Sequence, residues 1–520
     1  MARFGHAESM RVLLVKPASS AIDFGLAPFF QTEPLGLEYV AAALKARGHE
    51  TSVVDLRFER RRLPGVLRRV APQVVGISCV HVLDADATIA LASDVKAVDP
   101  TITVIVGGHA ASMFPEALSG CRDIDVVALG EGELRLPAIC DALVRGRGLD
   151  TVPGLLLPDG NRFVGTGEVA DLLDLDDVPV PDRATVARYQ QHYCCLNYMP
   201  VWTVETARGC CHRCTFCSVW QFHRRSLRFH SIEAVRADFA ATGPNVFIVD
   251  DTFWTGRERS AELAEALLVS PSRKNWLLVQ SRLDTVVDHP DLLERWRPLA
   301  RNFDVFFGFE APTSRGLDAL HKDVDISKTI EAIRIARKLG FGVTGNFIID
   351  PAYTEEDFEA LWAFLQEQQL SRVGFTILTP LPGTRYFDHM RDRLSVEDLS
   401  HYDLHHLLWQ PRLPVRRFFE LYCETWRRTV LYLQGQKKWW HWLSQVRLRD
   451  VPRLMRILSR TQRLMDPEAY LARTAFIERS AATSSHAQCP NDDCPVSDSV
   501  SGASVNLCPG DGTSATCVNE

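Results

Sequence analysis

Short apolar runs alternate with amphipathic, helix-like stretches in two separate rounds along this chain of 520 residues. In the first round, strands are expected at residues 11–16, 51–55, 73–78, 103–106 and 125–129. Helical patterns separate them, at residues 35–47, 64–70 and 85–98. Strands that are separated by helices of this length predict a parallel, doubly wound α/β sheet. A chain this long exceeds one ordinary core, so further domains are expected.

The second round of alternation predicts another parallel sheet. Its expected strands are residues 201–206, 246–250, 276–280, 304–309, 343–349 and 373–378. Helices are expected between them, at residues 231–242, 260–269, 326–339 and 355–368. Six strand–helix units form an open, partial (βα)6 barrel rather than a closed eightfold one, with its pocket at the carboxyl ends of the strands.

Composition divides the rest of the chain. With 46% hydrophobic and 24% charged residues, the chain is typical of a globular protein. The first predicted domain covers residues 10–147, and an irregular connector rich in Asp and Pro follows at 148–200. The barrel is predicted at 201–388, a basic helical region at 389–480 and a cysteine-containing tail at 481–520. The tail has the composition of a disordered segment.

A cysteine cluster follows the first predicted barrel strand, so it belongs to a loop at the pocket. Cys210, Cys214 and Cys217 have the spacing Cys-x3-Cys-x2-Cys, which can bind three irons of a [4Fe–4S] cluster and leave the fourth iron open. Zinc is the alternative, and it would need His212 or another residue as its fourth ligand. Cys211 is a neighbouring thiol outside this spacing.

With the aromatic Phe216 before its last cysteine, this loop resembles that of radical S-adenosylmethionine (SAM) enzymes. The resemblance implies that the open iron chelates SAM, whose reductive cleavage gives a 5′-deoxyadenosyl radical. It also assigns cofactor contacts to Phe216, to Asp250 and Asp251 after the second strand, and to Glu310 after the fourth. The Asp-Asp pair replaces the Gly-Gly-Glu stretch of the family, and it could instead cap the next helix.

The first domain places small and polar residues where its strands end, at the usual ligand edge of such folds. They are Ser78, Gly107, Gly108, His109, Gly130 and Glu131. Together these segments resemble the cobalamin-binding domain that precedes many radical SAM barrels, and the residues are candidate cofactor contacts. No Asp-x-His-x-x-Gly loop is present, which implies cobalamin without a protein histidine on cobalt. His109 could line the crevice, form a hydrogen bond or ligate the metal, and Ser78 could face the corrin or only pack.

Cobalamin before a radical barrel implies a methyltransferase that uses methylcobalamin to methylate an unactivated carbon. Residues 31–38, 217–222 and 224–228 are similar to hopanoid C-3 methylases, which implies a hopanoid lipid as substrate. Anaerobic porphyrin-ester cyclases and natural-product C-methyltransferases are alternatives within the family. A non-catalytic cobalamin sensor and a zinc-containing nucleic-acid enzyme are alternatives of other classes.

Location and partners follow from charge and apolar patterning. The chain has no uninterrupted apolar run of membrane-spanning length and no convincing signal peptide, so a cytoplasmic protein is expected. Basic and aromatic residues at 426–465, including residues 437–442, could lie on the inner membrane face or pack on the barrel. The net charge of −7 argues against a nucleic-acid partner. The expected partners are a hydrophobic small-molecule substrate and a flavodoxin- or ferredoxin-type electron donor.

Overall fold

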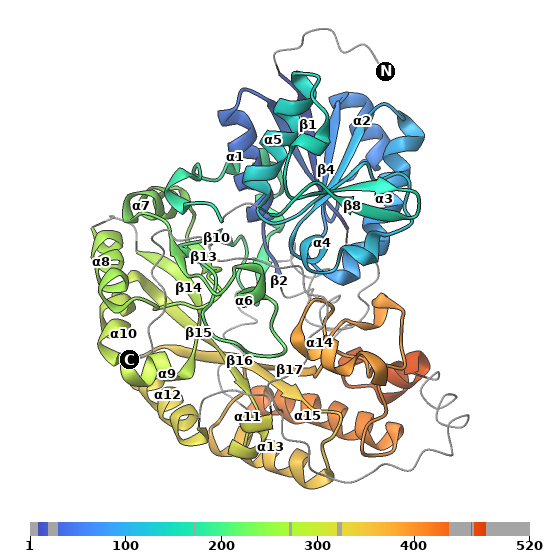
Figure 1. Ribbon diagram of the computed structural model, residues 1–520. Coiled ribbons are helices and arrows are strands. Elements are labelled where there is room, and N and C mark those ends of the chain that lie inside the picture. Colours follow the sequence, from blue (N-terminus) through green and yellow to red (C-terminus); the bar gives the residue numbers. More distant parts are fainter. Residues whose placement is uncertain are drawn as a thin grey trace.

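The structure is a computed structural model that describes residues 9–18, 30–169, 172–269, 273–319, 325–435, 459 and 462–474. Figure 1 shows an N-terminal α/β domain, in blue and teal, above a second domain that runs from green to orange. Each domain is built around its own sheet, in which the strands expected from the two rounds of alternation run parallel.

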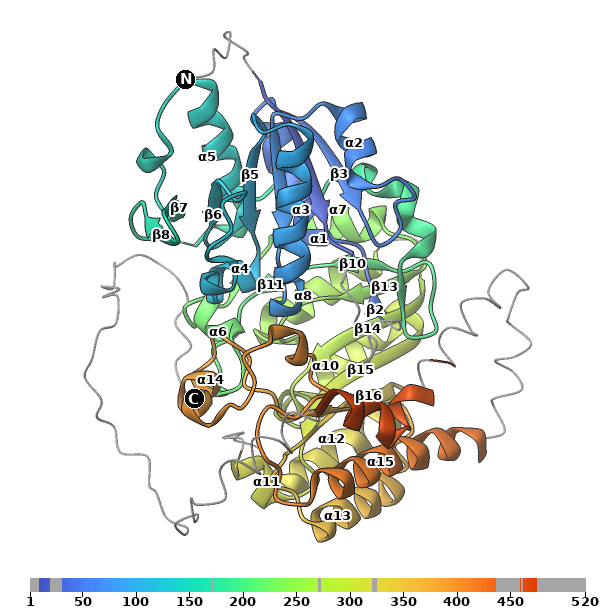
Figure 2. The ribbon, with the colours of Figure 1, turned by 90° about the vertical axis from the view of Figure 1, so that its right-hand side faces the viewer.

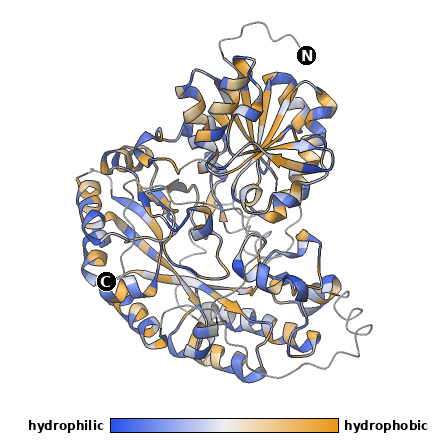
Figure 3. Ribbon diagram, in the orientation of Figure 1, coloured by the Kyte–Doolittle hydropathy of each residue, from blue (hydrophilic) through white to orange (hydrophobic). Residues whose placement is uncertain are grey.

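The N-terminal sheet has the strand order β3-β1-β4-β5-β6-β7-β8. Its strands are β1 (Arg11–Lys16), β3 (Glu50–Asp55), β4 (Val74–Ser78), β5 (Thr103–Gly107), β6 (Val126–Ala128), β7 (Leu155–Asp159) and β8 (Arg162–Gly165). Its helices are α1 (Leu35–Ala46), α2 (Leu63–Val70), α3 (Ala85–Val98), α4 (His109–Met113) and α5 (Gly132–Val144). The first five strands are parallel, and the order reverses at β1, which pairs with both β3 and β4. These strands are largely apolar because helices cover both faces (Figure 3).

The prediction of an irregular connector over residues 148–200 is wrong for residues 155–165, which form two strands. Strands β7 and β8 form an antiparallel hairpin that joins the sheet edge at β6. The turn lies at Gly160-Asn161, between the paired residues Asp159 and Arg162, and Gly160 is in the left-handed region at φ +66°. Both strands are short and mostly exposed, so their hydrophobic pattern is weak.

The second domain is the predicted partial barrel. Its parallel strands lie in sequence order: β10 (Trp202–Val204), β13 (Asn245–Ile248), β14 (Lys274–Ser281), β15 (Ala300–Glu310), β16 (Gly342–Ile349) and β17 (Val373–Ile377). The accompanying helices are α7 (Ile232–Ala241), α8 (Arg257–Leu268), α9 (Leu283–Asp288), α10 (Pro290–Trp296), α11 (Ser314–Ala319), α12 (Ile326–Lys338), α13 (Glu355–Glu367) and α14 (Arg385–Met390). Buried rings stabilise the later strands, and Phe347 stacks on Phe309 and Phe375 with centroid distances of 5.1 and 6.1 Å.

Short elements complete the junction between the domains. Two small antiparallel pairs join β2 (Phe30–Gln31) to β9 (Cys194–Cys195) and β11 (Ala207–Arg208) to β12 (Arg228–Phe229). The four-residue helix α6 (Val219–Phe222) follows the cysteine loop. These elements therefore hold the cysteine loop beside the N-terminal domain.

The C-terminal region packs on the barrel through α15 (Val415–Gly435), which lies beside α13 in both views (Figures 1 and 2). Trp426 is buried and its ring makes an edge contact with Phe375, at a centroid distance of 5.1 Å. The basic aromatic residues 437–442 and the predicted tail at 481–520 lie outside the described residues. In the described part of the chain, none of the helices combines the length and apolar character that crossing a bilayer requires.

Candidate active site between the two domains

The cysteine loop connects β11 to α6 and is held by hydrogen bonds from its own backbone and from neighbours. Cys217 N–H donates to the carbonyl oxygen of Cys214 (3.1 Å), and the Trp220 indole Nε1 donates to the same oxygen (3.0 Å). Tyr386 N–H, at the start of α14, donates to the carbonyl of Thr215 (3.0 Å). These contacts fix the backbone that carries the three predicted cluster ligands.

Gly209 sets the direction in which the chain enters the loop. Its φ of +98° is in the left-handed region, and a Cβ there would lie 2.1 Å from the carbonyl oxygen of Ser226. Its N–H donates to Asp251 Oδ2 (2.9 Å). Glycine is therefore required at this position, directly before Cys210.

The two predicted carboxylates after β13 support the loop and do not cap the next helix, because α8 begins later, at Arg257. Asp250 accepts hydrogen bonds from the backbone N–H (2.6 Å) and hydroxyl (2.5 Å) of Thr206. Burial raises the pKa of Asp250 to about 7. Asp251 accepts from Gly209, so the pair ties the end of β13 to the segment before the cysteines.

The buried thiols of this loop are compatible with the predicted cluster. Burial raises the pKa of Cys210 to about 12 and that of Cys217 to about 11, so their thiolates need a cationic partner such as iron. Among the described residues, no three His, Cys, Asp or Glu side chains converge on one point as a single ion requires. In a [4Fe–4S] cluster each thiolate binds a different iron, so such convergence is not needed.

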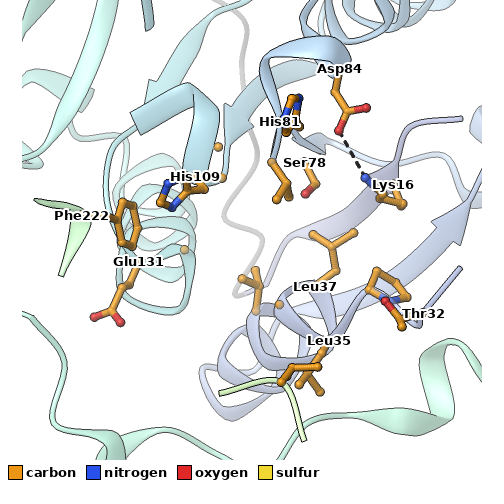
Figure 4. A pocket seen from close by; sticks show the side chains of 18 of the residues that line it. Lys16, Thr32, Leu35, Leu37, Ser78, His81, Asp84, His109, Glu131 and Phe222 are labelled. Carbon is orange, nitrogen blue, oxygen red and sulfur yellow. Dashed lines mark hydrogen bonds and ion pairs between the residues drawn. The ribbon is translucent and has the colours of Figure 1, made fainter. Parts of the chain in front are cut away.

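A cavity of about 840 Å³ lies where the N-terminal sheet meets the barrel. All six predicted residues of the N-terminal domain line it: Ser78, Gly107, Gly108, His109, Gly130 and Glu131. Figure 4 shows Ser78, His109 and Glu131 around this space, with Phe222 of α6 beside His109. The carboxyl ends of the parallel strands therefore meet at one site, as the fold predicts.

Backbone shape at this edge suits a ligand that approaches closely. Gly108 has φ +114°, and a Cβ there would lie 2.6 Å from the carbonyl oxygen of Cys79. The residue therefore has to be glycine, and the turn after β5 has no side chain at this point. The glycine is thus required by the close approach of the Cys79 backbone, and the turn borders a cavity whose volume suits a bulky group such as a corrin.

His109 links this edge to the cysteine loop. Its Nε2 lies 2.7 Å from Ser218 Oγ, directly after Cys217, and its ring packs on Phe222 at a centroid distance of 4.8 Å. Burial lowers the pKa of His109 to about 4, so the ring is neutral near pH 7. Because Ser218 belongs to the barrel domain, this hydrogen bond connects the two domains.

Glu131 lies within a buried ionic network that crosses the same junction. Its carboxylate contacts Arg208 (3.0 Å) and Arg228 (2.8 Å) and accepts from Leu173 N–H (2.9 Å). Burial alone would raise its pKa, but the hydrogen bonds and charges of Arg228 and Arg208 lower it to about 2. Glu131 is therefore ionised at neutral pH and holds the two domains together.

The predicted barrel residues divide into two groups. Asp251 borders the cavity, whereas the described lining does not include Cys210, Cys214, Cys217, Phe216, Asp250 or Glu310. Glu310 ends β15 at a bulge with φ +60°. Several lining residues are absent from the predicted set: Arg208, Phe222, His223 and the segment Asp403–His405. The sequence of that segment carries no motif beyond the adjacent histidines His405 and His406.

Comparisons with known proteins agree with this architecture. The sequence matches two family models: "B12 binding domain" over residues 26–140 and "Radical SAM superfamily" over residues 204–365. It is 31% identical to a hopanoid C-3 methylase of Methylococcus capsulatus, over 85% of this chain and 86% of that protein. It is 26% identical to an anaerobic magnesium-protoporphyrin IX monomethyl ester cyclase of Cereibacter sphaeroides, over 74% of this chain and 64% of that protein.

A solved structure shares the fold. The cobalamin-dependent S-adenosylmethionine radical enzyme OxsB, with aqua-cobalamin and S-adenosylmethionine bound, superimposes with a TM-score of 0.66. The alignment covers 91% of this chain and 76% of OxsB at 16% identity.

Proposed function

The chain belongs to the cobalamin-dependent radical SAM enzymes, and from this premise we propose that it methylates an unactivated carbon of a hopanoid lipid, at C-3. We infer that it is a methyltransferase whose cofactors are a [4Fe–4S] cluster, SAM and cobalamin, since a methylase of this family is similar to it over most of both chains. The choice of hopanoid is the finer part of the proposal. It rests on similarity to the M. capsulatus methylase along most of both chains.

One observation carries the catalytic part of the proposal. A single cavity is bordered by the strand ends of the cobalamin-type sheet and by residues adjoining the cysteine loop. Ser78 and Gly107 line one side, and Phe222, His223 and Asp251 line the other. Methyl transfer to an unactivated carbon needs the radical source and the methyl donor within reach of one substrate carbon.

Different residues of the chain would hold the cluster, orient its loop and align the two domains. Cys210, Cys214 and Cys217 would hold the cluster, while Gly209 and Asp251 fix the direction of their loop. When bound, SAM at the cluster supplies a radical that abstracts hydrogen, and cobalamin supplies the methyl group. The His109 contact with Ser218 keeps the two halves of the site in register.

We propose two further partners for this site. Reduction of the cluster needs an electron donor of the flavodoxin or ferredoxin type. A lipid substrate also favours contact with the inner face of the membrane.

The test is a lipid profile by mass spectrometry from host cells with and without the gene. Deletion should remove hopanoids that are one methylene heavier, and wild type should restore them, whereas Cys214→Ala should not. Cys211→Ala, which removes the adjacent thiol outside the Cys-x3-Cys-x2-Cys spacing, is the matched control and should restore them. An unchanged profile, in cells shown to make both the protein and its hopanoid precursor, would reject the hopanoid.

Two alternatives have their own tests. If the lipids do not change, porphyrins and natural products become the substrates to examine. A non-catalytic cobalamin sensor would not cleave SAM, so formation of 5′-deoxyadenosine by the reduced, cluster-loaded protein excludes it.

A further inference from the structure

The cavity has a third wall that neither matched family region contains. Asp403, Leu404 and His405 follow the barrel strands in sequence and line the cavity, beyond the matched residues 26–140 and 204–365. The adjacent 3₁₀ turn Leu399–His401 contacts the turn Val82–Asp84, which follows β4 of the N-terminal domain. The wall therefore faces the part of the cavity that belongs to the cobalamin-type domain.

This wall is held in one conformation. Leu404 has φ +68°, an unusual value for a residue with a branched side chain, and its carbonyl oxygen accepts from Ile377 N–H (2.7 Å). Asp403 accepts from His405 N–H (2.9 Å) and lies 2.8 Å from the ring nitrogen Nδ1 of His406. Strained backbone that its surroundings fix in this way is typical of binding sites.

The hydrogen bonds of His405 define its tautomer. Tyr422 Oη donates its only hydrogen to the carbonyl oxygen of Phe375 (2.8 Å). His405 Nδ1 lies 2.9 Å from that hydroxyl oxygen, so Nδ1 carries the hydrogen and donates it. Burial lowers the pKa of His405 to about 4, so the ring is neutral near pH 7. Its Nε2 is therefore a hydrogen-bond acceptor, and the described residues give it no partner.

His81 borders the same cavity with the opposite polarity. Leu83 N–H donates to His81 Nδ1 (3.2 Å), so in the neutral ring the hydrogen lies on Nε2. Burial lowers the pKa of His81 and favours this neutral form. Figure 4 shows His81 next to Ser78 at the edge of the sheet. Of the four histidines that line the cavity, His81 thus presents a hydrogen-bond donor and His405 an acceptor.

We propose that His405 and His81 recognise the carboxamide groups on the rim of the bound corrin. His405 Nε2 accepts a hydrogen bond from an amide N–H, and His81 Nε2–H donates to an amide oxygen. This inference rests on the proposed function, because it takes cobalamin as the ligand of the cavity. A carboxylate in place of the amide has no hydrogen to give to His405, so the wall selects amidated corrins.

The test measures corrin binding by the full-length, cluster-loaded protein. Hydroxocobalamin and its monocarboxylate derivatives, in which single rim amides are hydrolysed, are titrated into wild type, His405→Phe and His81→Phe. His389→Phe, on an exposed part of α14, is the matched control. Loss of one hydrogen bond should weaken cobalamin binding about tenfold in each cavity variant and leave the control unchanged.

Wild type should also bind at least one monocarboxylate more weakly than hydroxocobalamin, and His405→Phe should lose that preference. This comparison tests the proposal on wild type alone, even where a variant fails to fold. Equal affinities throughout would overturn the proposal. So would a nitrogen splitting in the cob(II)alamin electron paramagnetic resonance spectrum that His405→Phe abolishes, because His405 would then be a cobalt ligand. A wild type that binds no corrin would overturn the proposed function itself.

Discussion

At the scale of single residues, the entry to the cysteine loop depends on a glycine that no other residue can replace. Gly209→Ala would place a methyl group 2.1 Å from the carbonyl oxygen of Ser226 in a left-handed conformation. We expect the loop to shift and the iron content per chain to fall by more than about half, with a stability loss of about 1–3 kcal/mol. Iron and sulfide analysis after anaerobic reconstitution measures the first effect, and thermal unfolding measures the second.

Gly146→Ala is the control for this prediction. Gly146 also has a positive φ, +63°, but a Cβ there would meet nothing within 4 Å. It should cost about 1 kcal/mol and leave the iron content at the wild-type level. Full iron loading of Gly209→Ala would show that the loop tolerates the methyl group.

At the scale of elements, the hairpin of β7 and β8 belongs to the N-terminal domain. Leu155 is fully buried in the core beneath the sheet, together with Leu136 and Ile139 of α5. Leu155→Ala should therefore lower stability by about 2–5 kcal/mol. Val164→Ala, at a side chain that is 47% exposed in β8, should change it by less than about 0.5 kcal/mol. Thermal unfolding of both variants measures the two stability losses. Equal unfolding midpoints for Leu155→Ala and Val164→Ala would mean that the hairpin contributes nothing to the core.

Buried elements and local motifs were predicted from the sequence better than exposed elements and long-range contacts. Buried parallel strands such as β1 and β5 were predicted to within a residue, because helices cover them and their apolar runs are continuous. The hairpin of β7 and β8 was not predicted, because its strands are short and mostly exposed. Spacing alone predicts Cys210, Cys214 and Cys217 as cluster ligands, since all three lie in one loop. The role of His405 could not be predicted, because it depends on Tyr422 and on a backbone carbonyl far away in sequence.

At the scale of the whole molecule, the site exists only while the two domains stay in register. Arg208 and Arg228 belong to the barrel side, and both form ion pairs with Glu131 of the N-terminal domain. The side chains of Arg208 and Glu131 are 9% and 5% exposed, so water screens this pair only slightly. Without the Glu131 carboxylate, Arg208 keeps its ion pairs with Glu133 and Glu205, but the charge of the largely buried Arg228 is left uncompensated. Such a loss typically costs about 3–5 kcal/mol.

We therefore expect Glu131→Gln to lower the thermal midpoint of the protein by several degrees, and to increase its cleavage by protease at the domain junction. Asp159→Asn is the control, because the exposed pair of Asp159 with Arg162 should contribute almost nothing. The effect should also depend on pH. The folded-state pKa of Glu131, about 2, is below its ordinary value of 4.5, so its stabilisation is complete above pH 4.5 and is lost as the pH falls toward 2. The difference between wild type and Glu131→Gln in urea midpoint should accordingly shrink from pH 7 to pH 3.5. A difference that stays constant over this range would mean that the charge of Glu131 does not hold the domains together.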